Sequence, residues 1–135
     1  MEKDDAHLPR VVGMIDETMD ATGTVAGAAW RLTPPGRGLD ANVIALPAGD
    51  EIARHDGPDL DVLILGLDGA GTLETAGDDI ALTPGILVWL PPRSQRRFIA
   101  GPQGLRYFSV HRRKGGLTIG TAPPATQGEG TSARS

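Results

Sequence analysis

The chain has 135 residues and a formal net charge of −4, with 19 Gly, 11 Pro and no Cys. This length allows one domain with a hydrophobic core, and the lack of cysteine excludes disulfides, thiolate metal sites and a cysteine nucleophile. The negative charge argues against general nucleic-acid affinity, and no apolar run approaches the roughly 18 residues of a membrane span. Because the first residues are acidic, unlike a signal peptide, we expect a cytoplasmic protein that binds neither membranes nor nucleic acid.

The charges are divided unevenly along the chain. Residues 1–79 carry 16 acids and 5 bases, whereas residues 80–135 carry 1 acid and 8 bases. Seven of these bases lie between Arg93 and Lys114. Since the two halves interleave in a compact β fold, we expect the bases to pair with acids of neighbouring strands. A basic rim that gathers an anionic ligand is the alternative.

Short apolar runs separated by Gly and Pro predict an all-β protein with many tight turns. Residues 1 to about 9 are expected to be disordered, and residues 11–19 to form a short strand or a helical turn. Strands are predicted for residues 28–32, 41–46 and 51–55.

The stretch DVLILGLDGAG at residues 61–71 is apolar without polar alternation, which predicts a strand buried on both faces over residues 62–67. Asp68-Gly69 favours a tight hairpin, with residues 71–75 as the return strand. Further strands are expected at residues 79–82, 95–99, 105–110 and 117–119, with a turn at residues 100–104 and a second doubly apolar run, ILVWL, at residues 86–90. This series of short strands is typical of a sandwich or small barrel.

Two segments carry a family resemblance, GDEIARH from Gly49 to His55 and GILVWLP from Gly85 to Pro91, together with Gly69. Their spacing resembles the two motifs of the cupin superfamily over roughly residues 40–112. The resemblance implies an all-β, cupin-like antiparallel jelly-roll barrel. We expect it at residues 21–119, after a partly disordered N-terminal arm at residues 1–20 and before a disordered tail at residues 120–135.

The resemblance also identifies the positions of the usual cupin metal ligands, two His and a Glu from the first motif and a His from the second. Here these positions hold His55, Gly57, Val62 and Arg96. A single imidazole does not hold a divalent metal, and Val62 has no donor atom. We therefore expect no metal cofactor. The alternative is a divalent transition metal at His55, bound by an atypical ligand set that adds an Asp, such as one of the two at positions 59 and 61, and His111.

Arg96 is the most informative replacement, because the resemblance directs it into the barrel mouth. A guanidinium there is unfavourable without an anionic partner. One interpretation is an ion pair with Asp40, Asp59 or Asp61, or an outward orientation among the neighbouring arginines. The other is that Arg96 receives the carboxylate, enolate or phosphate of a small ligand, with His55 across the cavity as hydrogen-bond partner or acid/base.

Three further polar side chains, Tyr107, Ser109 and His111, share one strand face by alternation and would line the cavity if that face turns inward. Trp89 is expected in the core or a subunit interface, with a stacking role in the pocket as the alternative. A structural role for either histidine is also open.

These observations predict a metal-free, small-molecule-binding cupin-like protein with a barrel pocket for a polar or anionic organic ligand. The candidate ligand-binding residues are His55, Arg96, Tyr107, Ser109, His111 and Trp89, and His55 is the one candidate catalytic residue. The alternative is an enzyme, either a metal-free acid/base isomerase or cyclase or a metal-dependent oxygenase. Because two doubly apolar strands need a second cover, we expect a homodimer that packs through the sheet of residues 62–67 or 86–90.

Overall fold

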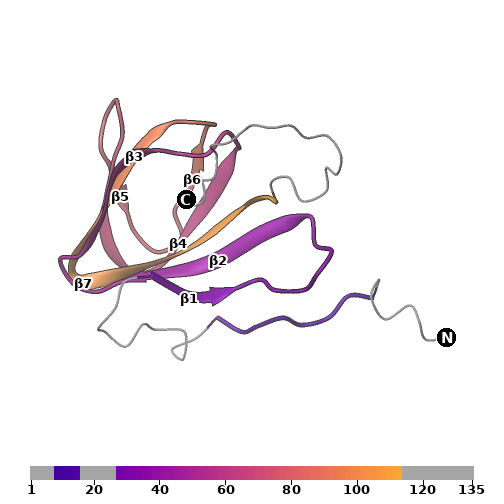
Figure 1. Ribbon diagram of the computed structural model, residues 1–135. Helices are drawn as coiled ribbons and strands as arrows, with labels where there is room; N and C mark the ends of the chain where they lie inside the picture. Colours follow the sequence, from indigo (N-terminus) through magenta and orange to yellow (C-terminus); the bar gives the residue numbers. More distant parts are fainter. Residues whose placement is uncertain (1–7, 16–26, 114–135) are drawn as a thin grey trace.

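The structure, a computed structural model, describes residues 8–15 and 27–113. In this part of the chain seven strands form one antiparallel sheet that curves into a barrel (Figure 1). They are β1 (Gly27–Arg31), β2 (Leu39–Leu46), β3 (Glu51–Asp56), β4 (Val62–Glu74), β5 (Ile80–Leu82), β6 (Leu87–Leu90) and β7 (Gln95–Arg112). The predicted all-β class is confirmed. The described residues include no helix long and apolar enough to cross a membrane.

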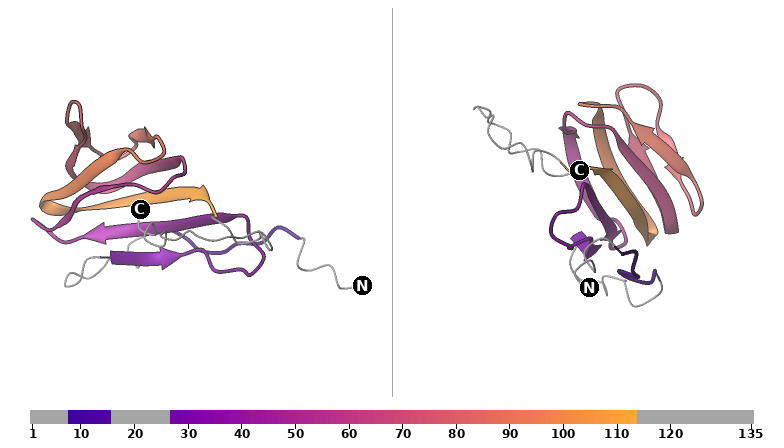
Figure 2. Two further views of the ribbon diagram at one scale, coloured as in Figure 1. Left: turned by 45° about the horizontal axis from the view of Figure 1, so that its top comes forward. Right: turned by 90° about the vertical axis from the view of Figure 1, so that its right-hand side faces the viewer.

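The sheet is organised around β4 and β7. Its strand order is β1-β2-β7-β4-β5, while β3 pairs with β7 and β6 pairs with β4. Figure 2 shows β1, β2 and β7 lying side by side along one wall. β7 therefore pairs with three strands, β2, β3 and β4, that follow one another earlier in the sequence.

Two predicted turns are wrong, because β4 and β7 each run through them without a break. The pairing of the two strands shifts register between Gly66 and Asp68 and again between Gly69 and Gly71. A side chain at Gly69 would lie 2.2 Å from the carbonyl oxygen of Gly104, and both residues have positive φ, +71° and +82°. The glycines thus allow a bulged corner with close backbone contact, instead of the hairpin at Asp68-Gly69 and the turn at residues 100–104.

The barrel interior is mainly apolar and is filled by alternate residues of the strands. Its core contains Leu46, Val62, Ile64, Leu73, Leu82, Leu90, Phe98, Ala100, Leu105 and Tyr107. Between two buried residues of β4, Leu63 is 44% exposed, and on β6 Leu87 and Trp89 are 64% and 62% exposed. The prediction that residues 62–67 and 86–90 are buried on both faces is therefore wrong. The barrel has one interior, and the described chain does not cover the outer face of these strands.

The N-terminal edge of the sheet differs from the sequence prediction. Residues 11–15 form neither a strand nor a helical turn, and residues 16–19 lie outside the described residues. The indole nitrogen Nε1 of Trp30 donates a hydrogen bond to the carbonyl oxygen of Val12 at 3.2 Å. On the outer face of β7, the ring of Phe108 lies 6.5 Å from that of Trp30. The predictions for residues 1–7, for the strand at 117–119 and for the tail at 120–135 concern residues that the structure does not describe.

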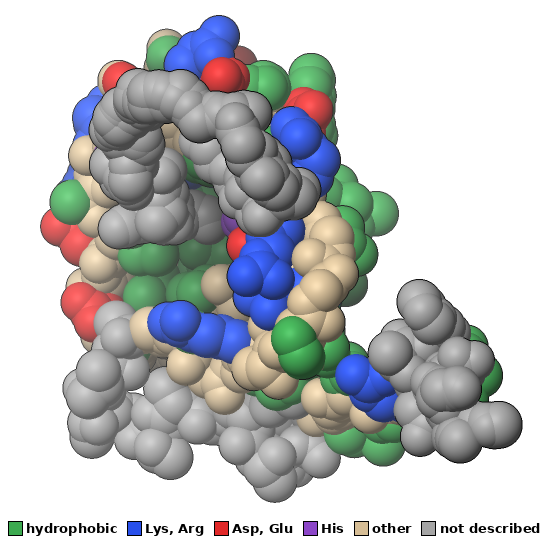
Figure 3. Space-filling model, turned by 45° about the vertical axis from the view of Figure 1, so that its right-hand side comes forward, with side chains coloured by type: hydrophobic (Ala, Val, Ile, Leu, Met, Phe, Trp, Pro, Cys, Tyr) green, Lys and Arg blue, Asp and Glu red, His purple; other side chains and the backbone are tan. Residues whose placement is uncertain are grey.

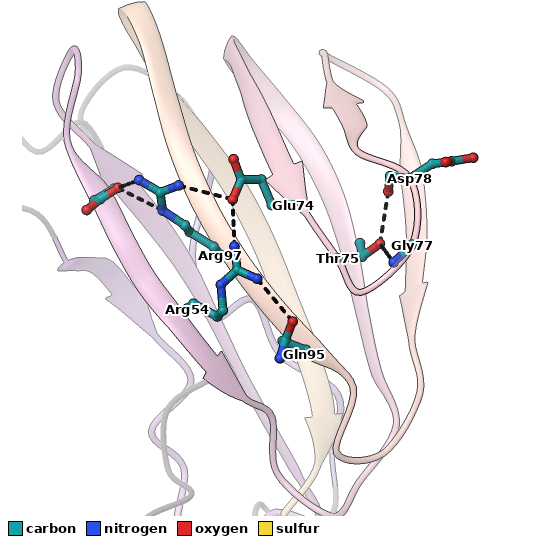
Figure 4. Close-up of polar contacts among 8 residues, drawn as sticks. Arg54, Glu74, Thr75, Gly77, Asp78, Gln95 and Arg97 are labelled. Atoms are coloured by element: carbon teal, nitrogen blue, oxygen red, sulfur yellow. Dashed lines mark hydrogen bonds and ion pairs between the residues drawn. The ribbon is translucent and has the colours of Figure 1, made fainter.

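The basic second half of the chain pairs with the acidic first half, as predicted. Arg97 contacts Glu51 at 2.6 Å and Glu74 at 3.0 Å. A base of the first half, Arg54, contacts the same Glu74 at 3.1 Å (Figure 4). This cluster, Glu51–Arg97–Glu74–Arg54, joins β3, β7 and β4 on the outside of the barrel. Two further ion pairs follow the same pattern, Arg93 with Asp59 and Arg106 with Asp68.

Candidate functional site

One side of the barrel is hollowed. Figure 3 shows hydrophobic side chains on the floor of this recess and Lys or Arg side chains beside its opening. The strand register turns several polar residues toward the barrel interior: Asn42 on β2, His55 on β3, and Arg96, Tyr107 and Ser109 on β7. We call the side chains of these five residues the interior polar cluster.

Arg96 is fully buried inside the barrel, with 0% of its surface exposed. Its Nε donates to the carbonyl oxygen of Ser94 at 3.1 Å, and its Nη2 donates to Ser94 Oγ at 2.8 Å and to the carbonyl oxygen of Pro91 at 3.5 Å. Among the residues that the structure describes, its Nη1 has no hydrogen-bond partner. Burial lowers the pKa of the guanidinium from its ordinary value, and interaction with Tyr107 opposes this effect. The inward orientation of Arg96 agrees with the direction that the family resemblance implies, and the outward alternative is wrong.

The carboxylates that were candidate partners of Arg96 lie elsewhere. Asp40 pairs with Arg37 at 2.9 Å, Asp59 pairs with Arg93, and Asp61 accepts a hydrogen bond from Trp89 Nε1 at 2.8 Å. The ion pair expected between Arg96 and one of these acids is absent. Within residues 8–15 and 27–113, Arg96 forms no ion pair.

Gly57 lies directly against the guanidinium. A Cβ atom added to Gly57 would be 2.2 Å from Arg96 Nη2 and 2.3 Å from Cζ. The cation therefore occupies space that a side chain at position 57 would need. Nor do the described residues include a group of three or more His, Cys, Asp or Glu side chains able to hold a metal ion. One imidazole beside a buried cation does not fit a divalent metal.

Tyr107 supplies a buried phenol. It is 1% exposed, and its ring stacks on Phe98 with a centroid distance of 4.8 Å and an interplanar angle of 9°. Its Oη has no hydrogen-bond partner. Burial raises the pKa of the phenol well above its ordinary value of 10.0, and the Arg96 charge acts in the opposite direction. The hydroxyl is therefore neutral at physiological pH and available as a hydrogen-bond donor.

His55 on β3 lies directly opposite Arg96 on β7 in the pairing of the two strands. Its Nδ1 lies 2.8 Å from the carbonyl oxygen of Ala53. Because a carbonyl oxygen only accepts, Nδ1 carries the proton of this hydrogen bond, and the neutral ring has its lone pair on Nε2. Nε2 is buried and has no partner.

The remaining inward polar residues lie farther along β7. Ser109 is 3% exposed and lies between Asn42 of β2 and Ile64 of β4 in the register. Asn42 Oδ1 is buried without a partner. The sequence prediction missed Asn42. Asn42 and Ile44 are two residues apart in ANVIAL and therefore share one face of the strand, which was a usable signal. His111 shares the inward face but is only half-buried, and its Nδ1 lies 2.8 Å from the carbonyl oxygen of Arg112.

Trp89 does not belong to the interior polar cluster. It is paired with the exposed Leu63 in the register of β6 and β4, and its indole lies on the outer face, hydrogen-bonded to Asp61. Its predicted alternative role as a stacking platform in the pocket is thus wrong, because strand alternation directs its neighbours Val88 and Leu90 inward and Trp89 outward.

No protein-family model matches this sequence, and no curated protein matches it. Solved structures are similar in fold. The Cnp3 cupin domain of Schizosaccharomyces pombe has a TM-score of 0.55 and 16% identity, over 61% of this chain and 57% of that chain. SPY1581 of Streptococcus pyogenes, a conserved protein of unknown function, has a TM-score of 0.60 and 18% identity, over 78% and 90% of the two chains.

The polyketide cyclase RemF of Streptomyces resistomycificus is also similar, with a TM-score of 0.53 and 18% identity, over 58% of this chain and 57% of that chain. The matched region thus spans little more than half of RemF and of the Cnp3 domain. Several further similar structures are cupin-2 conserved-barrel domains. These similarities confirm the predicted fold, a cupin-type antiparallel barrel.

Proposed function

Because this domain has the cupin fold and the described residues include no ion-pair partner for the buried Arg96, we propose that the protein binds a small polar or anionic organic molecule in the barrel, without a metal. The observation that carries this proposal is Arg96, which is fully buried and has no partner for Nη1. Leaving a buried charge without its counter-charge costs several kcal/mol. A bound anion would remove this cost.

Other members of the interior polar cluster support a small oxygen-bearing ligand. Tyr107 Oη and His55 Nε2 are buried and unpartnered, as is Asn42 Oδ1. Buried polar atoms in native proteins are nearly always hydrogen-bonded. Several such atoms inside one barrel are more simply explained by a shared ligand than by independent exceptions, and Ser109 offers a further hydroxyl beside them.

A thermal-shift titration with benzoate, acetate and inorganic phosphate tests this function. We expect at least one of these anions to raise the melting temperature of the wild-type protein, and the shift to disappear in Arg96→Met. Arg93→Met is the matched control, because Arg93 is exposed and paired with Asp59. Equal shifts in the wild type and Arg96→Met would contradict the proposal.

We propose that no metal cofactor takes part. The donor set supports this, since Gly57, Val62 and Arg96 replace the other three ligands that the cupin motifs would supply. Metal analysis of protein purified without chelators is expected to find less than stoichiometric metal. Stoichiometric metal that is lost in His55→Ala would instead favour the alternative, a divalent transition metal at His55.

Metal-free acid/base catalysis is the second candidate function, and the free lone pair of His55 Nε2 favours it. In such a reaction Nε2 would remove a proton from the carbon next to a carbonyl group, and the electron pair would move into an enolate whose oxygen lies on Arg96 and Tyr107. RemF, one of the structures similar in fold, is a polyketide cyclase. Deuterium incorporation into acetylacetone in D₂O tests this candidate, with His55→Phe as the inactive variant.

A further inference from the structure

Resting on the proposed function, we propose that the barrel ligand is an organic acid that carries a hydroxyl group next to its carboxylate. In this arrangement the carboxylate binds Arg96 and Tyr107, and the hydroxyl donates a hydrogen bond to His55. The proposal follows from the different hydrogen-bonding capacity of these three side chains.

Two of the three unpartnered atoms are donors. A guanidinium has no acceptor, so Arg96 Nη1 can only donate. Its other nitrogens are already used by Ser94 and Pro91, which leaves one nitrogen for the ligand. Tyr107 is close enough to Arg96 for the two groups to act on each other's pKa, and its phenol is neutral. A positive donor and a neutral donor together fit a carboxylate, which accepts at both oxygens.

The third atom is an acceptor. The hydrogen bond from Nδ1 to Ala53 leaves His55 Nε2 with a lone pair. His55 lies directly opposite Arg96 in the pairing of β3 with β7, so this acceptor lies next to the cation. A carboxylate oxygen in contact with Nε2 would bring two lone pairs together. A hydroxyl hydrogen satisfies Nε2 without this repulsion.

The rest of the ligand is expected to be apolar. The strand register places Ile44 and Gly66 on either side of Tyr107, and Phe98 stacks on its ring. The floor of the recess in Figure 3 is likewise hydrophobic. Apolar surroundings of this kind favour a hydrocarbon or aromatic body over a second charged group.

A pair of probes that differ only in the hydroxyl tests the proposal. Mandelate and phenylacetate share the aromatic ring and the carboxylate, but only mandelate has the adjacent hydroxyl. Binding to the full-length protein is measured by NMR titration. We expect the wild type to bind mandelate about tenfold more tightly than phenylacetate, the effect of one hydrogen bond to a buried acceptor. Mandelamide, which lacks the negative charge, should bind more weakly than mandelate.

Variants assign this preference to individual side chains. His55→Phe should remove the preference for mandelate while both acids still bind, and His55→Gln, which keeps an acceptor, should retain part of it. Arg96→Met should weaken both acids alike. Circular dichroism and thermal melting check that each variant is folded. If Arg96→Met does not fold, Tyr107→Phe replaces it, with weaker binding of both acids expected.

The outcomes separate this inference from the proposed function. Equal affinity for mandelate and phenylacetate, with both dependent on Arg96, would overturn the requirement for a hydroxyl and leave the proposed function intact. A preference for mandelate that persists in His55→Phe would overturn the role of His55. Absence of binding by either acid, or binding unaffected by Arg96→Met and Tyr107→Phe, would overturn the proposed function itself.

Discussion

The guanidinium of Arg96 fills the space in which Gly57 would carry a side chain, because a Cβ atom at Gly57 would approach Nη2 to 2.2 Å. The cupin motifs place ligand histidines at both positions, so the two replacements depend on each other. A Cβ atom at Gly57 would also lie 2.3 Å from Cζ of the guanidinium. The small residue at position 57 is thus part of the arginine site.

Gly57→Ala is expected to destabilise the fold by about 1–3 kcal/mol, the usual effect of overpacking. Gly38→Ala is the matched control, since a Cβ atom at Gly38 meets nothing within 4 Å and neither glycine has a positive φ. In a protein that already carries Arg96→Ala, Gly57→Ala should reduce the free energy of unfolding by less, because the guanidinium that clashes with the new Cβ atom is gone. Urea unfolding of the four variants and the wild type measures this coupling. If Gly57→Ala is equally destabilising with and without Arg96→Ala, positions 57 and 96 do not depend on each other through a steric clash.

Tyr107→Phe is expected to change the stability of the protein in alkaline solution. Burial raises the pKa of the folded-state phenol above its ordinary value of 10.0, so above pH 10 the unfolded chain releases a proton that the folded chain retains. The free energy of unfolding of the wild type should therefore fall above pH 10, with a slope of up to about 1.4 kcal/mol per pH unit. This contribution is fully present below pH 10.

The phenylalanine variant should lack this slope, and other groups that titrate at high pH cancel in the difference between the two proteins. Tyr107 is also the single tyrosine of the chain, so ultraviolet absorbance follows its ionisation directly. Parallel stability curves for wild type and variant, or ionisation of the folded protein near pH 10, would refute the burial argument.

Glu74 is the shared acceptor of the Glu51–Arg97–Glu74–Arg54 cluster. Glu74→Gln should lower the melting temperature modestly in low salt, because two arginines on different strands lose a counter-charge. The difference from the wild type should become smaller in 1 M NaCl, as expected for solvent-accessible ion pairs. Asp59→Asn, which affects one exposed pair with Arg93, should have the smaller effect. The opposite ranking would argue that the cluster does not stabilise the barrel.

The exposed apolar face of β4 and β6 is expected to bind a second copy of this chain. Leu63, Leu87 and Trp89 lie on this face and are 44%, 64% and 62% exposed, and burial of such apolar surface stabilises association. Light scattering should give twice the mass of one chain. Trp89→Asp should shift the protein toward the monomer, whereas Ala76→Asp, which adds the same charge at another exposed site, should not. A monomeric wild type would mean that this face is not a dimer interface.

Much of the fold could be predicted from local patterns. The apolar runs and the Pro-Gly turns located most strands, and the spacing of the glycines indicated the barrel. The corner at Gly69 could not be predicted, because Asp68-Gly69 has the same local preference for positive φ in a hairpin and in a bulge. The choice depends on the pairing of β4 with β7, which lies far away in sequence.

The candidate site was predicted in part. The motif spacing directed Arg96 inward on one of two interpretations, and strand alternation placed Tyr107 and Ser109 on one face without deciding whether that face was the interior. The surroundings of Arg96 could not be predicted, because each candidate acid found another partner, as Asp61 did with Trp89. The orientation of Trp89 could not be predicted either. A run without polar residues does not reveal which of its faces is the interior.

The position of β7 also bears on how the chain folds during synthesis. β2, β3 and β4 all take residues 95–112 as their hydrogen-bonding neighbour, and β4 residue Val62 pairs with His111. Until that segment has left the ribosome, these strands expose unpaired edges and apolar side chains to solvent. Closure of the barrel must therefore wait for a late part of the polypeptide, and contacts so distant in sequence form slowly. Unpaired strand edges and exposed apolar side chains favour aggregation in the interval before β7 pairs.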